Sequence, residues 1–389
     1  MKIITRTIWV LSFVSLFTDV ASEMLYPIMP IYLKSINFSI VLIGILEGVA
    51  EAVAGLSKGY FGKLSDNTGR RLPFVRWGYL LSALSKPMMA LFTFPAWIFG
   101  ARTIDRLGKG LRTGARDAML SDESTPATKG QVFGFHRSMD TFGAVVGPLS
   151  ALVFLYFYPG QYKTLFYIAF VPGIVAITLT FLLKDKNPTP KENIVTTRFT
   201  DFLKYWQNGP TAYKKLVAGL LLFTLFNSSD VFLLLKIKEA GNSDLVCILI
   251  YVSYNLVYAL ASYPIGIIAD KVGLKKMFII GLLLFTGVYL GMALTSNLYV
   301  FFGIFAVYGM YAAATEGIAK AWISNVTDKK DTATAIGTYS SFQSIGTMVA
   351  SSLAGFIWFK FGASVTFIAT AIVTGLVVVY FMGMKAERK

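Results

Sequence analysis

A short polar segment, GKLSDNTGRR at residues 62–71, separates two long apolar runs at 40–62 and 74–95. A related segment at residues 266–276 follows a third apolar run, 246–269. The matching residues are Gly62, Asp66, Gly69, Arg70 and Arg71 in the first copy and Gly266, Asp270, Gly273, Lys275 and Lys276 in the second, where one basic residue is displaced. This recurrence indicates two parallel copies of one helical unit, with a substrate site expected at their interface near the midplane.

The composition is that of an integral membrane protein. Hydrophobic residues make up 55% of the 389 residues, charged residues make up 15%, and the mean hydropathy is +0.61. Apolar runs of membrane-spanning length fall at 7–33, 40–62, 74–95, 97–119, 131–157, 163–183, 213–235, 246–269, 277–295, 298–324, 333–358 and 363–384. We therefore expect an all-α integral membrane fold of twelve transmembrane helices, with no room for a separate catalytic domain.

The basic residues orient this fold in the membrane. With the N-terminus placed in the cytoplasm, more than half of the 36 lysines and arginines fall in cytoplasmic segments and few fall in external loops. The run 7–33 has no convincing cleavage site, so we interpret it as an uncleaved first helix. We expect two six-helix halves, 1–184 and 213–389, joined by a cytoplasmic linker at 185–212. Both termini are then cytoplasmic, in a protein of the cytoplasmic (inner) membrane.

Residue counts exclude several classes of function. A single cysteine, Cys247, permits no intrachain disulfide, and a single histidine, His136, permits no Cys/His metal cluster. The net charge of +15 is explained by the membrane topology rather than by nucleic-acid binding. No nucleophile–base pair or cofactor loop stands out, so we expect no enzyme and no cofactor. The expected state is a monomer in the lipid bilayer.

These features resemble the major facilitator superfamily of secondary transporters, whose loop signature Gly-x-x-x-Asp-x-x-Gly-Arg-Arg is matched by residues 62–71. The resemblance covers nearly the whole chain and implies alternating access. It also implies that the first, fourth, seventh and tenth helices line the cavity. The gating residues that it implies are Gly62, Asp66, Gly69, Arg70, Arg71, Arg112, Arg116 and Asp270, with Arg70, Arg112 or Arg116 expected as partners of Asp66.

The run 97–119 holds an unusual density of charge. Charged residues inside a membrane helix are costly, so each is a functional candidate. We expect Arg102, Arg106 and Lys109 to bind substrate or to take part in coupling, and Asp105 to pair with Lys109 one turn later. Arg112 and Arg116, nearer the cytoplasm, pair either with acids such as Asp66 and Asp117 in a latch or with substrate.

Acidic residues in neighbouring runs complement these cations. Asp19 and Glu23 share one face of the first run, and Glu47 and Glu51 share one face of the second. Such carboxylates either load and release protons as an arginine approaches and departs, or form a permanent salt-bridge network. Asp140 precedes a Gly143-to-Pro148 segment that is similar to a motif associated with proton antiporters that export substrate. Asp140 is therefore a further cavity candidate.

The second half carries less charge, with Asn227, Asp230 and Glu316 as its candidates. We expect a proton-coupled transporter of a small anionic or zwitterionic organic molecule, with export favoured over uptake. The alternatives are a divalent metal transporter that uses carboxylate ligands, a multidrug efflux pump, and a receptor-like protein on the same scaffold.

Overall fold

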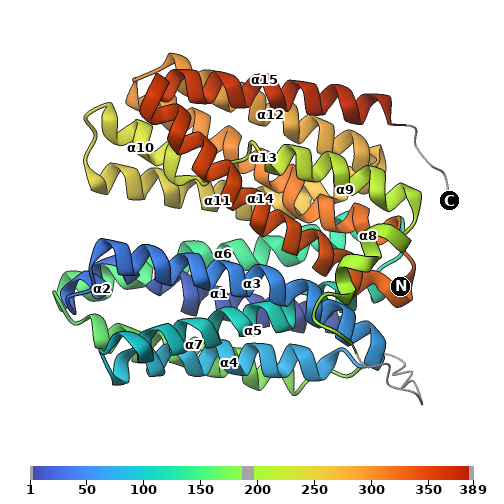
Figure 1. Cartoon of the computed structure of the whole chain (residues 1–389), viewed down its shortest axis with the longest axis horizontal. Coiled ribbons are helices and arrows are strands. Elements are labelled where there is room, and N and C mark those ends of the chain that lie inside the picture. Colours follow the sequence, from blue (N-terminus) through green and yellow to red (C-terminus); the bar gives the residue numbers. More distant parts are fainter. Residues whose placement is uncertain (1–2, 186–196, 385–389) are drawn as a thin grey trace. The chain divides into compact units, whose positions relative to one another are not determined.

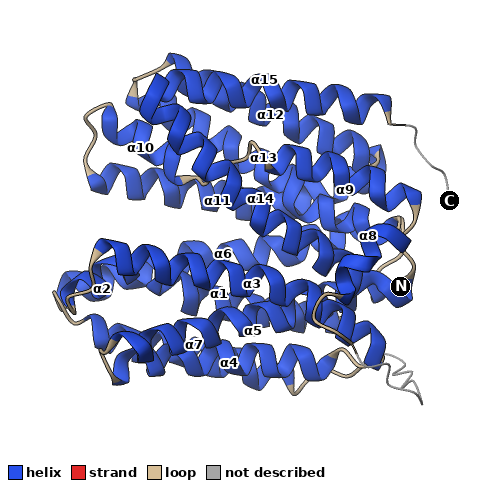
Figure 2. Ribbon diagram, in the orientation of Figure 1, coloured by secondary structure: helices blue, strands red, loops and turns tan. Residues whose placement is uncertain are grey.

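A computed structural model of the chain describes residues 3–185 and 197–384, and within these ranges every regular element is a helix (Figure 2). The predicted all-α class is confirmed. Part of the predicted linker, residues 186–196, lies outside the described residues.

The helices follow one another along the chain as labelled in Figure 1. The first group is α1 (Arg6–Leu25), α2 (Met29–Ser35), α3 (Ile40–Thr68), α4 (Leu72–Leu91), α5 (Pro95–Asp122), α6 (Lys129–Phe157) and α7 (Tyr162–Thr180). The second group is α8 (Lys204–Asn208), α9 (Thr211–Thr224), α10 (Val231–Glu239), α11 (Asp244–Val272), α12 (Leu274–Leu294), α13 (Leu298–Asn325), α14 (Thr332–Phe361) and α15 (Ala363–Gly383). Two 3₁₀ turns, η1 (Asp201–Leu203) and η2 (Lys329–Asp331), precede α8 and α14.

Two of the predicted spans are interrupted. The run 7–33 forms α1 and α2, because Pro27 and Pro30 lack the backbone N–H that a continuous helix needs. The run 213–235 forms α9 and α10, and the break between them contains Asn227 and two serines, which compete with helical backbone bonding. Corresponding runs of the two sequence copies are therefore both discontinuous.

Eight of the described helices are long and apolar enough to cross a membrane by length and composition: α1, α6, α7, α11, α12, α13, α14 and α15. The other predicted spans have identifiable reasons for falling below that level. Helices α3 and α5 carry several charged residues, α4 contains Arg76 and Lys86, and α9 and α10 are shortened by the break between them.

The helices group into two compact units. The first unit consists of Met1–Ser124, Met139–Asn208 and Asp328–Ser341, and the second of Thr125–Ser138, Gly209–Thr327 and Phe342–Lys389. Helix α6 therefore begins in the second unit and continues in the first, whereas α14 begins in the first and continues in the second. The division into halves at the 185–212 linker stays a prediction.

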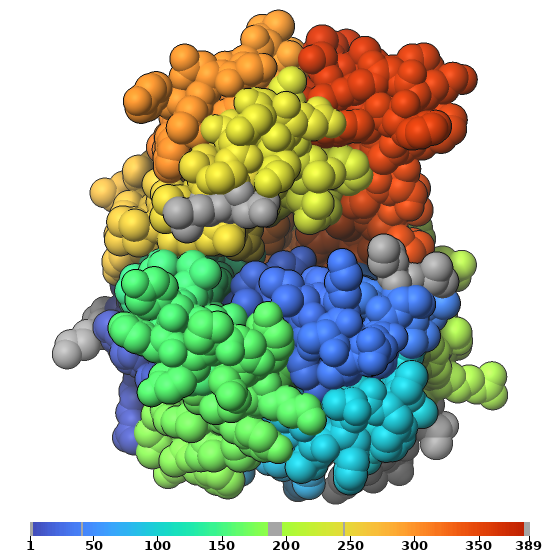
Figure 3. Space-filling model, turned by 90° about the vertical axis from the view of Figure 1, so that its left-hand side faces the viewer, coloured from blue at the N-terminus to red at the C-terminus, as the bar shows by residue number. Residues whose placement is uncertain are grey.

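Within each unit, taken by itself, alternate turns gather at one end, as the colours of Figure 3 allow the reader to follow. In the first unit these are the turns that follow α2, α4 and α6 (blue, cyan and green). In the second unit they are the turns that follow α10, α12 and α14 (yellow, orange and red). This alternation is the one expected for helices that cross a layer repeatedly.

Small residues bring α1 and α6 into direct backbone contact. A Cβ atom on Gly143 would lie 2.6 Å from the Leu16 carbonyl oxygen, and one on Gly147 would lie 2.7 Å from the Met24 nitrogen. Because only glycine fits such an approach, the Gly143-to-Pro148 segment places Asp140 beside the polar face of α1.

Residues 197–208 of the predicted linker belong to the first unit and pack within it. Phe202 is only 2% exposed, and its ring lies directly against Gly59 of α3, where a Cβ atom would have no space. The Thr338 hydroxyl of α14 donates to the Phe202 carbonyl at 3.2 Å. The linker therefore ends in a segment docked between α3 and the beginning of α14.

Candidate functional site

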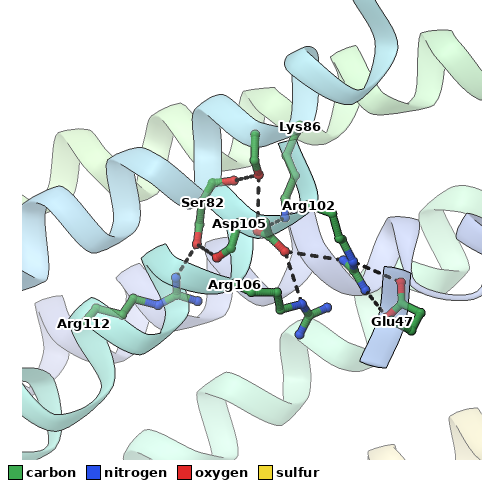
Figure 4. A network of polar contacts seen from close by, with 8 residues as sticks. Glu47, Ser82, Lys86, Arg102, Asp105, Arg106 and Arg112 are labelled. Carbon is green, nitrogen blue, oxygen red and sulfur yellow. Dashed lines mark hydrogen bonds and ion pairs between the residues drawn. The ribbon is translucent and has the colours of Figure 1, made fainter. Parts of the chain in front are cut away.

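Asp105 lies at the centre of an ion-pair network in the first unit (Figure 4). Its Oδ1 is 2.8 Å from Lys86 Nζ of α4, and its Oδ2 is 3.4 Å from Arg102 Nη1 and 3.7 Å from Arg106 Nε. The predicted pair with Lys109 is absent from the described contacts of Asp105. Sequence reasoning missed Lys86, although a lysine inside the apolar run 74–95 was a signal of the same kind.

Arg102 extends the network from α5 to α3. It donates two parallel hydrogen bonds to Glu47, from Nε to Oε1 at 3.0 Å and from Nη2 to Oε2 at 2.8 Å. This bidentate geometry is the strong form of an arginine–carboxylate pair. Glu47 and Arg102 therefore belong to a salt-bridge network in this conformation, which was one of the two interpretations of Glu47.

Four further charged side chains lie beside this network without being paired in it. Lys109 and Glu51 are exposed, Asp19 and Glu23 are half-buried, and the side chains of these four residues make no described hydrogen bond or ion pair. Lys109 is nevertheless close enough to act electrostatically on all three carboxylates, and Arg106 acts on Glu23 and Glu51. Both signs of charge are thus present together on one face of the unit.

Asp140 is bound to α1 and, through it, to α5. The Ser15 hydroxyl donates to Asp140 Oδ1 and accepts from Arg116 Nη1 at 3.3 Å. Arg116 also pairs with Asp117, Nη2 to Oδ1 at 2.8 Å, which is one of the acids expected for it. Ser15 was not predicted as a site residue, and only the packing of three helices reveals it.

Arg112 contacts no acid within hydrogen-bonding distance among the described residues. Its Nη1 donates to the Ser82 hydroxyl at 2.5 Å, and its guanidinium carbon lies 4.6 Å from the centre of the Tyr79 ring. A cation over an aromatic face is stabilised by the ring quadrupole. Arg112 is therefore held by α4 rather than by Asp66 or Asp117.

Asp66 binds the first turn of α14. Its Oδ2 accepts from the backbone nitrogen and the hydroxyl of Thr334, each at 2.7 Å, and its Oδ1 is 3.6 Å from Arg71 Nη2. A carboxylate at a helix N-terminus is favoured by unpaired N–H groups and by the helix dipole. The described partners of Asp66 are thus Arg71 and Thr334, not Arg70, Arg112 or Arg116.

Other residues of the segment 62–71 contribute to the contact between the end of α3 and the start of α14. Gly62 allows the close approach of α14, since a Cβ there would collide with the Ala333 carbonyl oxygen. Gly69 ends α3 in the left-handed conformation at φ 63°, and Arg71 Nε is 3.2 Å from Asp122. Arg70 is exposed.

The second copy of the motif makes the equivalent contact in the second unit. Asp270 accepts from the backbone nitrogens of Gly130 and Gln131, each at 2.7 Å, at the first turn of α6. The two aspartates therefore cap α14 and α6 respectively, and these are the two helices that pass from one unit to the other.

The remaining candidates lie in an aromatic region of the second unit. Tyr308 donates to Asp230 Oδ1 at 2.6 Å, and Asn227 donates to the Tyr311 hydroxyl at 3.2 Å. Glu316 Oε2 is 3.7 Å from Arg137 Nη2. Asp230 is thus the acid that faces the tyrosines of α13, whereas Glu316 is part of a half-exposed ion pair.

The described residues contain no group of three or more histidine, cysteine, aspartate and glutamate side chains that could hold a metal ion. The carboxylates of the first unit instead lie among lysines and arginines.

Comparisons with known proteins bear on the family and the fold of the chain. A family model described as Major Facilitator Superfamily matches residues 11–241 and 237–389. An uncharacterised MFS-type transporter of Methanocaldococcus jannaschii is 31% identical over 388 residues, which cover 97% of this chain and 95% of the relative. A multi-drug resistance efflux pump PmrA homologue of Lactococcus lactis is 21% identical over 359 residues, which cover 88% of this chain and 87% of the relative. The crystal structure of the human organic anion transporter MFSD10 matches with a TM-score of 0.78 at 16% identity, covering 97% of this chain and 99% of the other.

Proposed function

The chain belongs to the major facilitator superfamily of membrane transporters, and on that premise we propose that it exports a small zwitterionic or anionic organic molecule in exchange for protons. A multi-pass membrane transporter, rather than an enzyme, is what the family establishes. The substrate, the coupling ion and the direction are the proposal.

The observation that supports an acidic group on the substrate is the incomplete pairing of Arg106. Its only described ion-pair contact is with Asp105, at 3.7 Å, and its Nε is buried without a hydrogen-bond partner among the described residues. Asp105 is already bound by Lys86 and Arg102. Because a guanidinium has five N–H donors, Arg106 retains the capacity to bind a substrate carboxylate or phosphate.

The neighbours of Arg106 favour a zwitterion over a simple anion. Glu23 and Glu51 lie within electrostatic range of both Arg106 and Lys109. A substrate that carries only negative charge would meet these carboxylates at a cost, whereas a substrate amine would offset them. A molecule with an acidic and a basic group therefore fits this face best.

Proton coupling would use Asp19 and Glu23. Neither has a described ion pair, both are half-buried, and Lys109 is close to both. A substrate whose amine pairs with Asp19 or Glu23 would favour the ionised form of that acid and displace its proton. Substrate and proton would then compete for the same carboxylates, as exchange requires.

Two observations favour export. The Gly143-to-Pro148 segment is similar to the antiporter motif, and the Lactococcus lactis relative is named as an efflux pump homologue. The second of these also makes multidrug efflux the second candidate function.

The orientation belongs to the same proposal, with both termini and the linker cytoplasmic in the inner membrane. Asp66 would then act at the cytoplasmic end. Its bonds to Thr334 and Arg71 support a latch that holds α14 in one conformation and releases it in another.

The proposal is tested by a thermal-shift screen of the purified protein against amino-acid-like zwitterions, organic anions, cationic drugs and divalent metals. A ligand that binds the folded state raises the melting temperature by mass action. A zwitterion should stabilise wild type and should not stabilise Arg106→Gln, while the matched exposed control Arg198→Gln should behave as wild type. Stabilisation by cationic drugs alone would favour multidrug efflux and contradict the substrate assignment.

A further inference from the structure

A serine on α1 joins two charged groups that otherwise belong to different parts of the site. Ser15 Oγ donates to Asp140 Oδ1 of α6 and accepts from Arg116 Nη1 of α5 at 3.3 Å. Ser15 is 2% exposed, Asp140 7% and Arg116 8%, so water does not replace these bonds freely. We propose that Ser15 is a positioning residue that transmits the protonation state of Asp140 to the Arg116–Asp117 pair, an inference that rests on the proposed proton coupling.

Close helix packing fixes this contact. Gly143 is one turn after Asp140 and lies against the carbonyl of Leu16, the residue that follows Ser15 in α1. The backbones of α1 and α6 therefore touch at this level, and the short serine side chain is enough to reach the carboxylate.

The hydrogen-bonding capacity of a hydroxyl explains why the protonation state matters. A serine has one proton to donate and two lone pairs to accept with. While Asp140 is ionised, that proton goes to the carboxylate in a charge-assisted bond, and a lone pair receives Arg116. When Asp140 takes up a proton, the charge that holds Ser15 and draws Arg116 toward α6 is lost, and Arg116 is left with Asp117 as its acid partner.

Other charged groups also face Asp140 and must be separated from this effect. From α1 these are Asp19 and Glu23, and from α5 it is Arg116 with its partner Asp117. On α6 itself, His136 is one turn earlier. Substituting Ser15 changes none of these charges, so it separates the effect of the Ser15 hydrogen bonds from the effect of the surrounding charged groups.

The test follows the titration of Asp140 in purified full-length protein without any ligand, by the infrared carbonyl band of its protonated form, identified as the band missing in Asp140→Asn. Ser15→Ala should move this titration to higher pH by about one to two units, the shift equivalent to losing one hydrogen bond to a charged group. Ser15→Thr keeps the hydroxyl and should leave the titration near its wild-type position. Ser12→Ala, which removes a buried serine one turn earlier, is the matched control.

A second measurement tests the link itself. Arg116→Gln should shift the Asp140 titration less in a Ser15→Ala background than in a wild-type background, since the part of its effect that passes through the Ser15 hydroxyl is lost while the direct electrostatic part remains. If Ser15→Ala does not fold, Ser15→Cys, whose thiol is a weak donor, should give an intermediate shift. An unchanged titration in Ser15→Ala, or equal effects of Arg116→Gln in the two backgrounds, would overturn the proposal. Because no substrate is used, either outcome is distinct from failure of the proposed transport function.

Discussion

Asp105→Asn should destabilise the protein more than Lys86→Met, although the two residues form one ion pair. Lys86 is 3% exposed, and Asp105 is its only described partner. Replacing the aspartate leaves a buried ammonium without a counter-charge, which costs about 3–5 kcal/mol. Arg102 is affected less, because it keeps its bidentate bonds to Glu47.

The reverse substitution leaves no such orphan. In Lys86→Met, Asp105 keeps Arg102 and Arg106, and methionine fills the space of the lysine stem. The loss is then one hydrogen bond to a charged group, about 1.5–3 kcal/mol. The double variant Lys86→Met/Asp105→Asn removes the unpaired ammonium and should be more stable than Asp105→Asn alone.

The free energy of unfolding is measured by denaturing-detergent titration in mixed micelles, with tryptophan fluorescence as the signal. Lys163→Met, at an exposed position, is the matched control and should change stability by less than about 0.5 kcal/mol. A Lys86→Met protein that is as unstable as Asp105→Asn, or a double variant less stable than both, would refute the assignment of Asp105 as the centre of the network.

Three further predictions follow from the helix contacts and the topology. Asp66→Asn should weaken the cap on α14 and increase amide hydrogen exchange near Thr334, whereas Asp201→Asn, at a linker site, should not. If the amides near Thr334 are as protected in Asp66→Asn as in wild type, the latch assignment is wrong. Gly143→Ala should lower the free energy of unfolding by about 1–3 kcal/mol, because its Cβ would lie 2.6 Å from the Leu16 carbonyl oxygen. The control Gly100→Ala, which has open space around it, should be neutral or stabilising. Equal melting temperatures of the two variants would contradict the close packing of α1 and α6. In a Cys247→Ser background, an impermeant thiol reagent should label Ser35→Cys on whole cells and Lys204→Cys only after permeabilisation, and the opposite pattern would reverse the topology.

The sequence predicts the helices well because membrane spans are recorded in continuous apolar runs. It does not predict the interruptions as clearly. Pro27 and Pro30 are visible, but a proline in an apolar run is compatible with a kink or with a break, and the surrounding packing decides between them. The break at Asn227 has no proline at all.

The charged candidates were located better than their partners. The density of charge in α5 identified Arg102, Asp105 and Arg106, because charge inside an apolar helix is rare. Lys86 was overlooked because one lysine barely changes the average of a long apolar run. The choice of Lys86 over Lys109 as the partner of Asp105 depends on the contact of α4 with α5, where a Cβ on Gly78 would lie 2.7 Å from the Gly108 carbonyl.

Long-range contacts were the least predictable part of the site. Asp66 was expected to bind an arginine because opposite charges attract. Its strongest described contacts are instead to the backbone and hydroxyl of Thr334. Thr334 belongs to the other sequence half, and backbone donors at a helix N-terminus leave no pattern in the side chains.

The most direct test of proton-coupled transport is the release of protons when a stabilising ligand binds to purified protein in weakly buffered solution. Wild type should exchange protons on binding, whereas Asp19→Asn or Glu23→Gln, kept only if its melting temperature is preserved, should bind the ligand without exchanging them. Proton release that persists in both variants would move the coupling site to Glu47, Glu51, Asp140 or Glu316, and binding without proton release in wild type would contradict the claim of coupling itself.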